Sequence, residues 1–283
     1  MPEVHEPDYL LIMGAPKSQH KISKAKGKRK FSFVLIMITI GVSLAIGIYG
    51  YIFKRYVLSP YGRFRALHSE IHYPEQYTVR GIDISRYQGK IKWDDVKTEQ
   101  IGGEDIQFVF IKATEGVSIF DPYFKDNFRQ ARLNGILRGA YHYFSPSVTG
   151  LSQAQHFTKH VKLKIGDLPP VLDVEEIGNL SIASLQKEVL DWLVYVENYY
   201  GVKPIIYSGH NFKKKNLSNP KLRDYPFWIA HYYKDQLDYD GDWLFWQHTD
   251  LGDIKGIKGD VDLNIFNGSL SDLKALTIDS LAC

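Results

Sequence analysis

The stretch PPVLDVEE, residues 169–176, places a short apolar run directly after two prolines and then presents three acidic side chains within four positions. A short apolar run that follows a turn signal is typical of a buried strand. Side chains alternate between the two faces of a strand, so Asp173 and Glu175 share one face and Leu172 and Val174 share the other. The pattern predicts a core strand that presents two carboxylates to one side.

The rest of the chain from residue 80 alternates strand-like and helix-like patterns. Helical spacing or helix-boundary residues predict helices over 121–135, 149–163 and 181–201, with Asp121 as an N-cap. Including 169–175, the strand candidates are 78–85, 107–113, 136–144, 169–175, 203–208, 226–232, 243–249 and 259–266. This alternation predicts parallel strands with crossover helices. Eight strands in about 200 residues favour the α/β class and an irregular, TIM-like β/α barrel.

Two other strand candidates repeat the acidic pattern. Asp83 lies between Ile82 and Ile84, and Asp262 lies between two apolar residues in GDVDLNIF. In a barrel these carboxylates would meet those of Asp173 and Glu175 near the carboxyl ends of the strands, where active sites gather. Crowded carboxylates raise one another's pKa, which gives a protonated acid beside ionised partners, as glycoside hydrolysis requires.

A plainer interpretation makes these acids strand-end caps or members of ion pairs. Lys112 and Arg86 are the cations close to them in sequence, so few pairs of this kind are available. Aromatic residues gather at the same strand ends, and apolar sugar faces stack on aromatic rings. As substrate-binding candidates we take Tyr141, Tyr143, Tyr207, Trp228, Tyr232, Trp246 and Gln247, although each aromatic alone is more often a core residue.

The amino-terminal part of the chain has a different character. Residues 1–79 carry 11 Lys and Arg against 5 Asp and Glu, whereas the remainder is net acidic. Residues 31–53 contain no charged residue and are long enough to span a bilayer of about 30 Å. The basic residues before them predict a cytoplasmic tail at 1–30, a single transmembrane helix at 31–53 and a linker at 54–79. Residues 80–283 would then form one catalytic domain in the periplasm or outside the cell; the alternative is a cleaved signal peptide.

Several other chemistries lack their motifs. The sequence has no Walker loop, no GxGxxG after a strand, no HExxH and no GxSxG elbow, and its single cysteine is Cys283. We therefore expect no metal, no cofactor and no nucleic-acid partner.

Taken together, GIDISRYQGKIKW, FVFIKATEG, the segment from PYF to GAYHYF, VLDVEE, IIYS, FWIAHY, FWQHT and GDVDLNIFNG resemble glycoside hydrolase family 25, the Chalaropsis-type lysozymes. The resemblance covers about residues 80–268 and implies an irregular β/α barrel that cleaves the β-1,4 bond after N-acetylmuramic acid in peptidoglycan. It implies that Glu175 is the proton donor and that Asp173 stabilises positive charge at the reacting sugar. Asp83 and Asp262 match the other acidic positions of the family's site.

Two further hypotheses are a scaffold, which belongs to another functional class, and a related barrel hydrolase with a different substrate. A membrane-anchored scaffold would bind peptidoglycan without cleaving it, although such a protein has no physical reason to keep mutually repelling acids. A chitin-cleaving barrel normally carries a longer DxxDxDxE run, and Pro169 to Leu172 stand where those acids would be. The sequence leaves open the oligomeric state, and also whether the intermediate is a glycosyl-enzyme or an oxazolinium ion.

Overall fold

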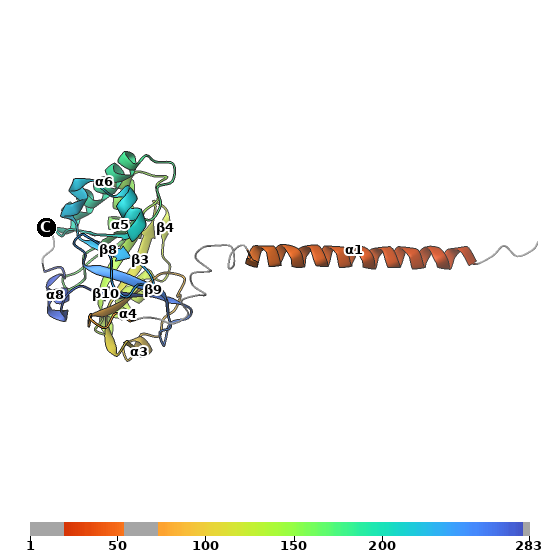
Figure 1. Cartoon of the computed structure of the whole chain (residues 1–283), viewed down its shortest axis with the longest axis horizontal. Helices are drawn as coiled ribbons and strands as arrows, with labels where there is room; N and C mark the ends of the chain where they lie inside the picture. Colours follow the sequence, from red (N-terminus) through yellow and green to blue (C-terminus); the bar gives the residue numbers. More distant parts are fainter. Residues whose placement is uncertain (1–19, 54–72, 280–283) are drawn as a thin grey trace, which may run out of the picture. The chain divides into compact units, whose positions relative to one another are not determined.

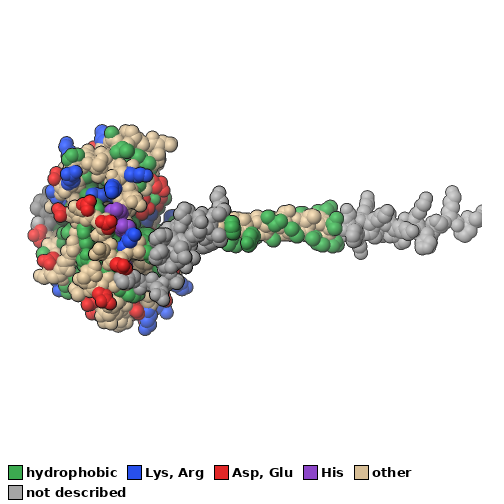
Figure 2. Space-filling model, viewed as in Figure 1, with side chains coloured by type: hydrophobic (Ala, Val, Ile, Leu, Met, Phe, Trp, Pro, Cys, Tyr) green, Lys and Arg blue, Asp and Glu red, His purple; other side chains and the backbone are tan. Residues whose placement is uncertain are grey.

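The computed structural model describes residues 20–53 and 73–279 (Figure 1). The chain divides into two compact units, Met1–Ser69 and Glu70–Cys283. In the first unit, helix α1 (His20–Phe53) exposes apolar side chains all along its second part (Figure 2). Its segment Phe33–Phe53 is 21 residues long and apolar enough to cross a membrane. Most of the expected tail and linker, at 1–19 and 54–72, lies outside the described residues.

The second unit is built on a closed eight-stranded barrel. Hydrogen bonds follow the order β1-β10-β9-β8-β7-β6-β5-β3, and β3 pairs back onto β1. The strands are β1 (Arg80–Ile84), β3 (Glu104–Glu115), β5 (Leu137–Tyr143), β6 (Val171–Asp173), β7 (Ile205–Gly209), β8 (Phe227–Ala230), β9 (Phe245–Gly252) and β10 (Val261–Phe266). Each of the eight predicted strands is confirmed. Two short strands, β2 (Gln100–Ile101) and β4 (Ile119–Phe120), add to β3 and were not predicted.

Strand β10 departs from the expected parallel arrangement, since it runs antiparallel to both β1 and β9. The connection from β9 to β10, residues 253–260, contains no helix. A parallel neighbour needs a crossover of a dozen or more residues, whereas a short connection suits an antiparallel one. The length of this connection therefore explains the reversed strand.

The helices lie outside the barrel (Figure 1). They are α3 (Trp93–Val96), α4 (Phe124–Leu133), α5 (Gly150–His160), α6 (Ile182–Tyr200), α7 (His210–Asn216) and α8 (Leu270–Ala275), with a 3-10 turn η2 (Pro220–Asp224). The three predicted helices correspond to α4, α5 and α6. Helix α4 begins at Phe124 and not directly after Asp121. One oxygen of the Asp121 carboxylate accepts the N–H of Tyr123, in a turn ahead of the helix, and the other accepts the N–H of Arg86, after β1.

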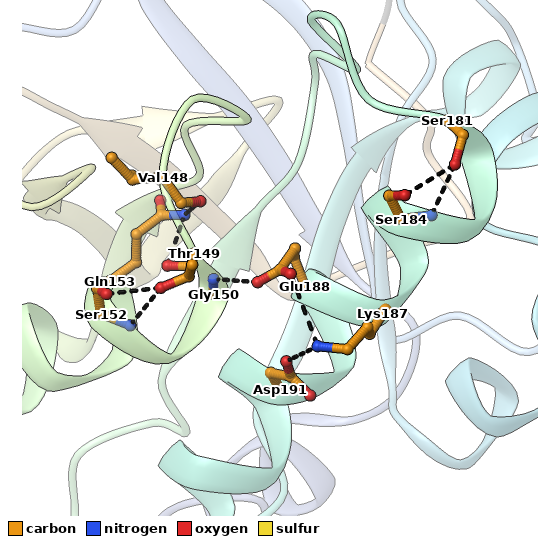
Figure 3. A network of polar contacts seen from close by, with 10 residues as sticks. All are labelled: Val148, Thr149, Gly150, Ser152, Gln153, Ser181, Ser184, Lys187, Glu188 and Asp191. Atoms are coloured by element: carbon orange, nitrogen blue, oxygen red, sulfur yellow. Dashed lines mark hydrogen bonds and ion pairs between the residues drawn. The ribbon is translucent and has the colours of Figure 1, made fainter.

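Single residues determine where helices α5 and α6 begin and how closely they approach each other (Figure 3). Thr149 and Ser181 cap them by accepting the N–H groups of Ser152 and Ser184, at 3.3 and 3.1 Å. At Gly150 the two helices approach so closely that a Cβ atom would lie 1.8 Å from the carbonyl oxygen of Glu188. Only glycine fits at this contact.

Two apolar layers hold the domain together. Leu172 and Val174 belong to the layer between barrel and helices, as predicted from their shared face. The second layer fills the barrel interior and consists mainly of Phe108, Phe110, Val171, Ile205, Trp228, Phe245 and Phe266. Because this interior is packed with side chains, polar groups that point inward gather only at its mouth.

Candidate active site

The predicted carboxylates meet at one rim of the barrel. Asp173 is the last residue of β6, and Asp83 is the next-to-last residue of β1. Asp262 lies near the start of β10, but because that strand is reversed its start reaches the same rim. In the β1–β10 ladder, Asp83 and Asp262 stand directly opposite each other. The structure thus brings the acids of the first and last strands together.

Asp83 is buried within a fixed set of amide donors. Its Oδ2 accepts Nε2 of Gln247 at 2.7 Å and Nδ2 of Asn264 at 2.8 Å. Asn264 in turn accepts the indole N–H of Trp228 at 2.8 Å, which fixes the orientation of its amide. Burial raises the pKa of Asp83 to about 7, although the two amide donors oppose the shift. Burial and the charge of Asp83 raise the pKa of Asp262 well above its usual range.

Asp173 and Glu175 differ in exposure. Asp173 is buried, and its Oδ1 has no hydrogen-bond partner among the described residues. Burial and then the charge of Glu175 raise the pKa of Asp173. Glu175 lies two residues beyond the end of β6 and is exposed at the mouth. The surrounding protein still removes part of its hydration and raises its pKa, against the opposing effects of Tyr207 and Lys112.

Lys112 is the cation whose charge acts on both Asp173 and Glu175. Its Nζ lies 2.8 Å from Oε2 of Glu115 and 4.5 Å from the ring centre of Tyr143. Its positive charge lowers the pKa of both Asp173 and Glu175. Arg86, the other cation considered from the sequence, is exposed and stacks over Tyr87. A single lysine therefore offsets only part of the negative charge.

Five of the seven substrate-binding candidates surround the acids. The hydroxyls of Tyr207 and Tyr232 both donate to Oε1 of Gln247, each at 2.7 Å. Tyr141 is half-buried, and its pKa is raised by burial and then by the charges of Asp83, Asp173 and Asp262. Tyr143 is half-buried, and its hydroxyl donates to Oε1 of Glu176 at 3.4 Å.

The two tryptophans lie elsewhere. Trp228 is buried in the barrel interior, stacked on Phe110 at 4.7 Å, so it supports the site from below. Trp246 is also buried, and it donates its indole N–H to the carbonyl of His231 at 2.8 Å. It occupies the face of β9 opposite to Gln247, since neighbouring residues of a strand alternate. The structure does not bring Trp246 to the site.

Asn264 is a site residue that the sequence analysis did not select. Asp262 and Asn264 are two positions apart in β10 and therefore share a face. Applying the alternation rule to GDVDLNIF would have found it. In the part of the chain that the structure describes, no group of three or more acidic, histidine or cysteine side chains is arranged to hold a metal ion.

Comparison with known proteins agrees with this geometry. Residues 82–257 match the model of glycosyl hydrolases family 25. The Escherichia coli K12 protein YegX is 51% identical over 206 residues, 72% of this chain and 75% of that one. Lysozyme M1 of Streptomyces globisporus is 33% identical over 70% of this chain and 71% of its own length.

A solved structure of a family 25 glycosyl hydrolase from Bacillus anthracis superposes with a TM-score of 0.67 at 30% identity. The superposition covers 74% of this chain and 98% of that one. These matches confirm the resemblance, the barrel fold and the enzyme class expected from the sequence. The chain therefore belongs to glycosyl hydrolases family 25 and is a glycoside hydrolase.

Proposed function

We propose that this chain is a lysozyme that hydrolyses the β-1,4 bond between N-acetylmuramic acid and N-acetylglucosamine in peptidoglycan. The observation that carries the proposal is the exposed carboxyl group of Glu175, with a raised pKa, beside the buried Asp83 and Asp173 and the half-buried Asp262 at the barrel mouth. The names of two relatives support the substrate: Lysozyme M1 and the N,O-diacetylmuramidase of Chalaropsis, which is 30% identical over 70% of this chain.

Glu175 is the general acid in this proposal. A raised pKa keeps its carboxyl group protonated in a larger fraction of molecules, and exposure lets it reach the oxygen of a bound glycosidic link. When Glu175 donates its proton, the bond between C1 and that oxygen breaks and positive charge develops on the muramic acid ring. The carboxylate that remains then accepts a proton from the attacking water.

Asp173 stabilises this positive charge. Its buried Oδ1, without a partner among the described residues, is available to accept the N–H of the substrate's acetamido group. That hydrogen bond would orient the acetamido oxygen to attack C1 and form an oxazolinium ion, which water opens with retained configuration. This route needs no covalent bond between Asp173 and the sugar.

Asp83 and Asp262 complete the group of acids around the reacting sugar, with Gln247 and Asn264 holding Asp83 in place. Tyr141, Tyr143, Tyr207, Tyr232 and Gln247 are the candidates for sugar contacts, by stacking and through their polar groups. Trp228 is proposed only as a support beneath them, because it is buried.

We also propose that α1 anchors the enzyme in the membrane. In this arrangement residues 1–30 face the cytoplasm, 31–53 span the bilayer, 54–79 form a linker and 80–283 act on peptidoglycan outside. The support is the apolar segment Phe33–Phe53 together with the basic residues that precede it. A tether of this kind would limit cleavage to peptidoglycan close to the membrane.

The test of the lysozyme proposal compares the chain with its Glu175→Gln variant on purified peptidoglycan. We expect the unaltered chain to release muropeptides that end in reducing N-acetylmuramic acid, identified by mass spectrometry. The variant should be about 10² to 10⁴ times slower, because it keeps the shape of Glu175 and loses its proton. No cleavage by the folded chain on several peptidoglycans would instead favour a binding scaffold.

A further inference from the structure

A cavity lies away from the acids, at the amino ends of strands β8 and β9. It has a volume of about 680 Å³ and is formed by α7, by η2 and by the segment that leads into β9. Cavities that bind small ligands typically measure roughly 300 to 1,000 Å³. Because the acids gather at the carboxyl ends of the parallel strands, the two places lie at opposite ends of β8 and β9.

Lys213 is the central cation of this cavity. Its ammonium group lies 4.4 Å from the ring centre of Phe227 and 4.3 Å from that of Tyr239, and it donates to the Tyr239 hydroxyl. Lys213 is half-buried, and neither it nor Arg223, which also lines the cavity, forms an ion pair with a described residue. Burial, and then the charge of Arg223, lower the pKa of Lys213. The two cations repel each other, and an anion bound between them would relieve this repulsion.

Acidic residues line the same cavity but remain apart from the two cations. Asp240 and Asp242 are exposed on the segment before β9, and Asp224 is exposed at the end of η2. None of the three carboxylates lies within ion-pair distance of Lys213 or Arg223. The cavity therefore offers separate positive and negative positions beside aromatic walls. Three carboxylates disfavour a phosphate group, which carries only negative charge.

We propose that this cavity binds a zwitterionic peptide group, with a carboxylate at Lys213 and Arg223 and an ammonium group at Asp240 and Asp242. The inference rests on the proposed function, because peptidoglycan supplies such a group in its stem peptides. Where the stem contains meso-diaminopimelate, one carbon of its side chain carries both a carboxylate and an ammonium group. The enzyme would then hold a stem peptide at a place separate from the glycan strand that it cleaves.

The experiment uses the full chain in detergent and two free stem tetrapeptides, one with meso-diaminopimelate and one with lysine at the third position. The two peptides differ by one carboxylate, and neither contains a glycosidic bond, so binding is measured by calorimetry without turnover. We expect the diaminopimelate peptide to bind about tenfold more tightly, because charge-assisted hydrogen bonds to a carboxylate are strong.

Three variants locate the binding. Lys213→Met and Arg223→Gln should each remove the preference for the diaminopimelate peptide, and Asp242→Asn should weaken both peptides. Lys214→Met is the matched control, since Lys214 is exposed on the same helix and does not line the cavity. Thermal unfolding is measured for each variant to check that it is folded. Asp242→Asn and Arg223→Gln change exposed side chains, so they keep the test valid if Lys213→Met does not fold.

Equal affinity for the two peptides, or binding that none of the three variants changes, would overturn the proposal. So would the absence of binding by the folded chain. Cleavage of peptide-free glycan strands is measured in parallel, so a failure here is distinct from a failure of the lysozyme proposal. Lys213 and Arg223 lie outside the carboxylate group, and we expect their variants to cleave peptide-free glycan at the unaltered rate.

Discussion

At the level of single residues, the role of Asp173 differs between two possible chemical routes. If Oδ1 accepts the acetamido N–H, Asp173 acts without bonding to the sugar; if it attacks C1, a glycosyl-enzyme forms. The two routes make opposite demands on the substrate, because only the first requires the acetamido group.

The first prediction follows from this difference. A thiazoline analogue of the oxazolinium ion should inhibit the chain competitively, and it should bind the Asp173→Asn variant at least tenfold more weakly, since the carboxyl group that accepts the acetamido N–H is lost. A 2-fluoro sugar that traps glycosyl-enzymes should leave no adduct on intact protein in a mass spectrum. An adduct located on Asp173 would establish the covalent route instead.

The second prediction concerns Asp83 and pH. The folded-state pKa of this carboxyl group is about 7, above its unfolded value of about 3.9. The folded state therefore keeps a proton that the unfolded state has lost between these pH values. The stability that this proton contributes is fully present below about pH 4 and is lost as pH rises to 7.

Asp83→Asn removes the titration, so the melting temperature of the variant should depend less on pH between 4 and 7. Relative to the unaltered chain it should melt a few degrees higher at pH 8, since about 1 kcal/mol corresponds to roughly 2 to 4 °C in a domain of this size. Calorimetry at four pH values provides the check. Parallel curves for the two proteins would show that Asp83 does not carry the shift.

At the level of elements, a buried network ties the loop after β5 to the site. The side chain of Gln153 on α5 donates to the carbonyls of Ser145 and Val148 and accepts the N–H of Ser145. Its Oε1 also lies 3.1 Å from Nε2 of His142, so His142 donates from Nε2 and accepts Thr114 at Nδ1. Burial lowers the pKa of His142 to about 3, which keeps its ring neutral at ordinary pH.

The loop that Gln153 holds contacts the segment carrying Glu175. The N–H of Phe144 donates to the carbonyl of Asp173 at 2.8 Å. Pro146 packs against Gly178, where a Cβ atom would lie 2.7 Å from the proline ring. The position of the segment that carries Glu175 therefore depends on a buried helix residue, Gln153.

The third prediction compares two buried glutamines. Gln153→Met and Gln186→Met should both lower the melting temperature, because Gln186 also bonds a backbone carbonyl, that of Asn216 at the end of α7, at 2.7 Å. Only Gln153→Met should lower kcat, by about tenfold at a temperature where both variants are folded, with KM little changed. Similar kcat values for the two variants would leave Gln153 with a purely structural role.

Period-two alternation made much of this architecture predictable. Short strand-like runs identified all eight barrel strands, and alternation along them placed Asp83, Asp173 and Asp262 on inward faces. The reversed direction of β10 was missed because we extended the βα pattern to a connection that contains no helix. Trp246 was chosen as a candidate because it lies near a strand end. The face of the strand that it occupies was not considered. The hydrogen-bond partners of Asp83 lie on β9 and β10, far along the chain. Only the register of the strand pairs shows that they meet Asp83.

At the level of the whole molecule, the proposed membrane anchor α1 would decide where the enzyme works. The fourth prediction is that Ile40→Lys with Leu44→Lys releases the chain from the membrane fraction, because a lysine at the centre of a spanning helix costs about 2.5 to 3.5 kcal/mol. Leu133→Lys, on an exposed position of α4, is the control and should leave the chain in the membrane.

Fractionation and amino-terminal sequencing of the mature protein provide the measurement for both variants. The unaltered chain should retain its first residues and sediment with the membrane. A soluble mature protein that begins after residue 53 would identify the apolar segment as a signal peptide.

The pairing of β1 with β10 has a consequence for biosynthesis. Asp83 leaves the ribosome about 180 residues before Asp262. Until the final strand is made and inserted, the barrel has an open seam, and Asp83 lacks both Asn264 and its facing acid. A chain still being synthesised therefore holds most of its acids but not the arrangement that they form. The group of acids is complete only after the carboxyl-terminal strand β10 has been made and has paired with β1.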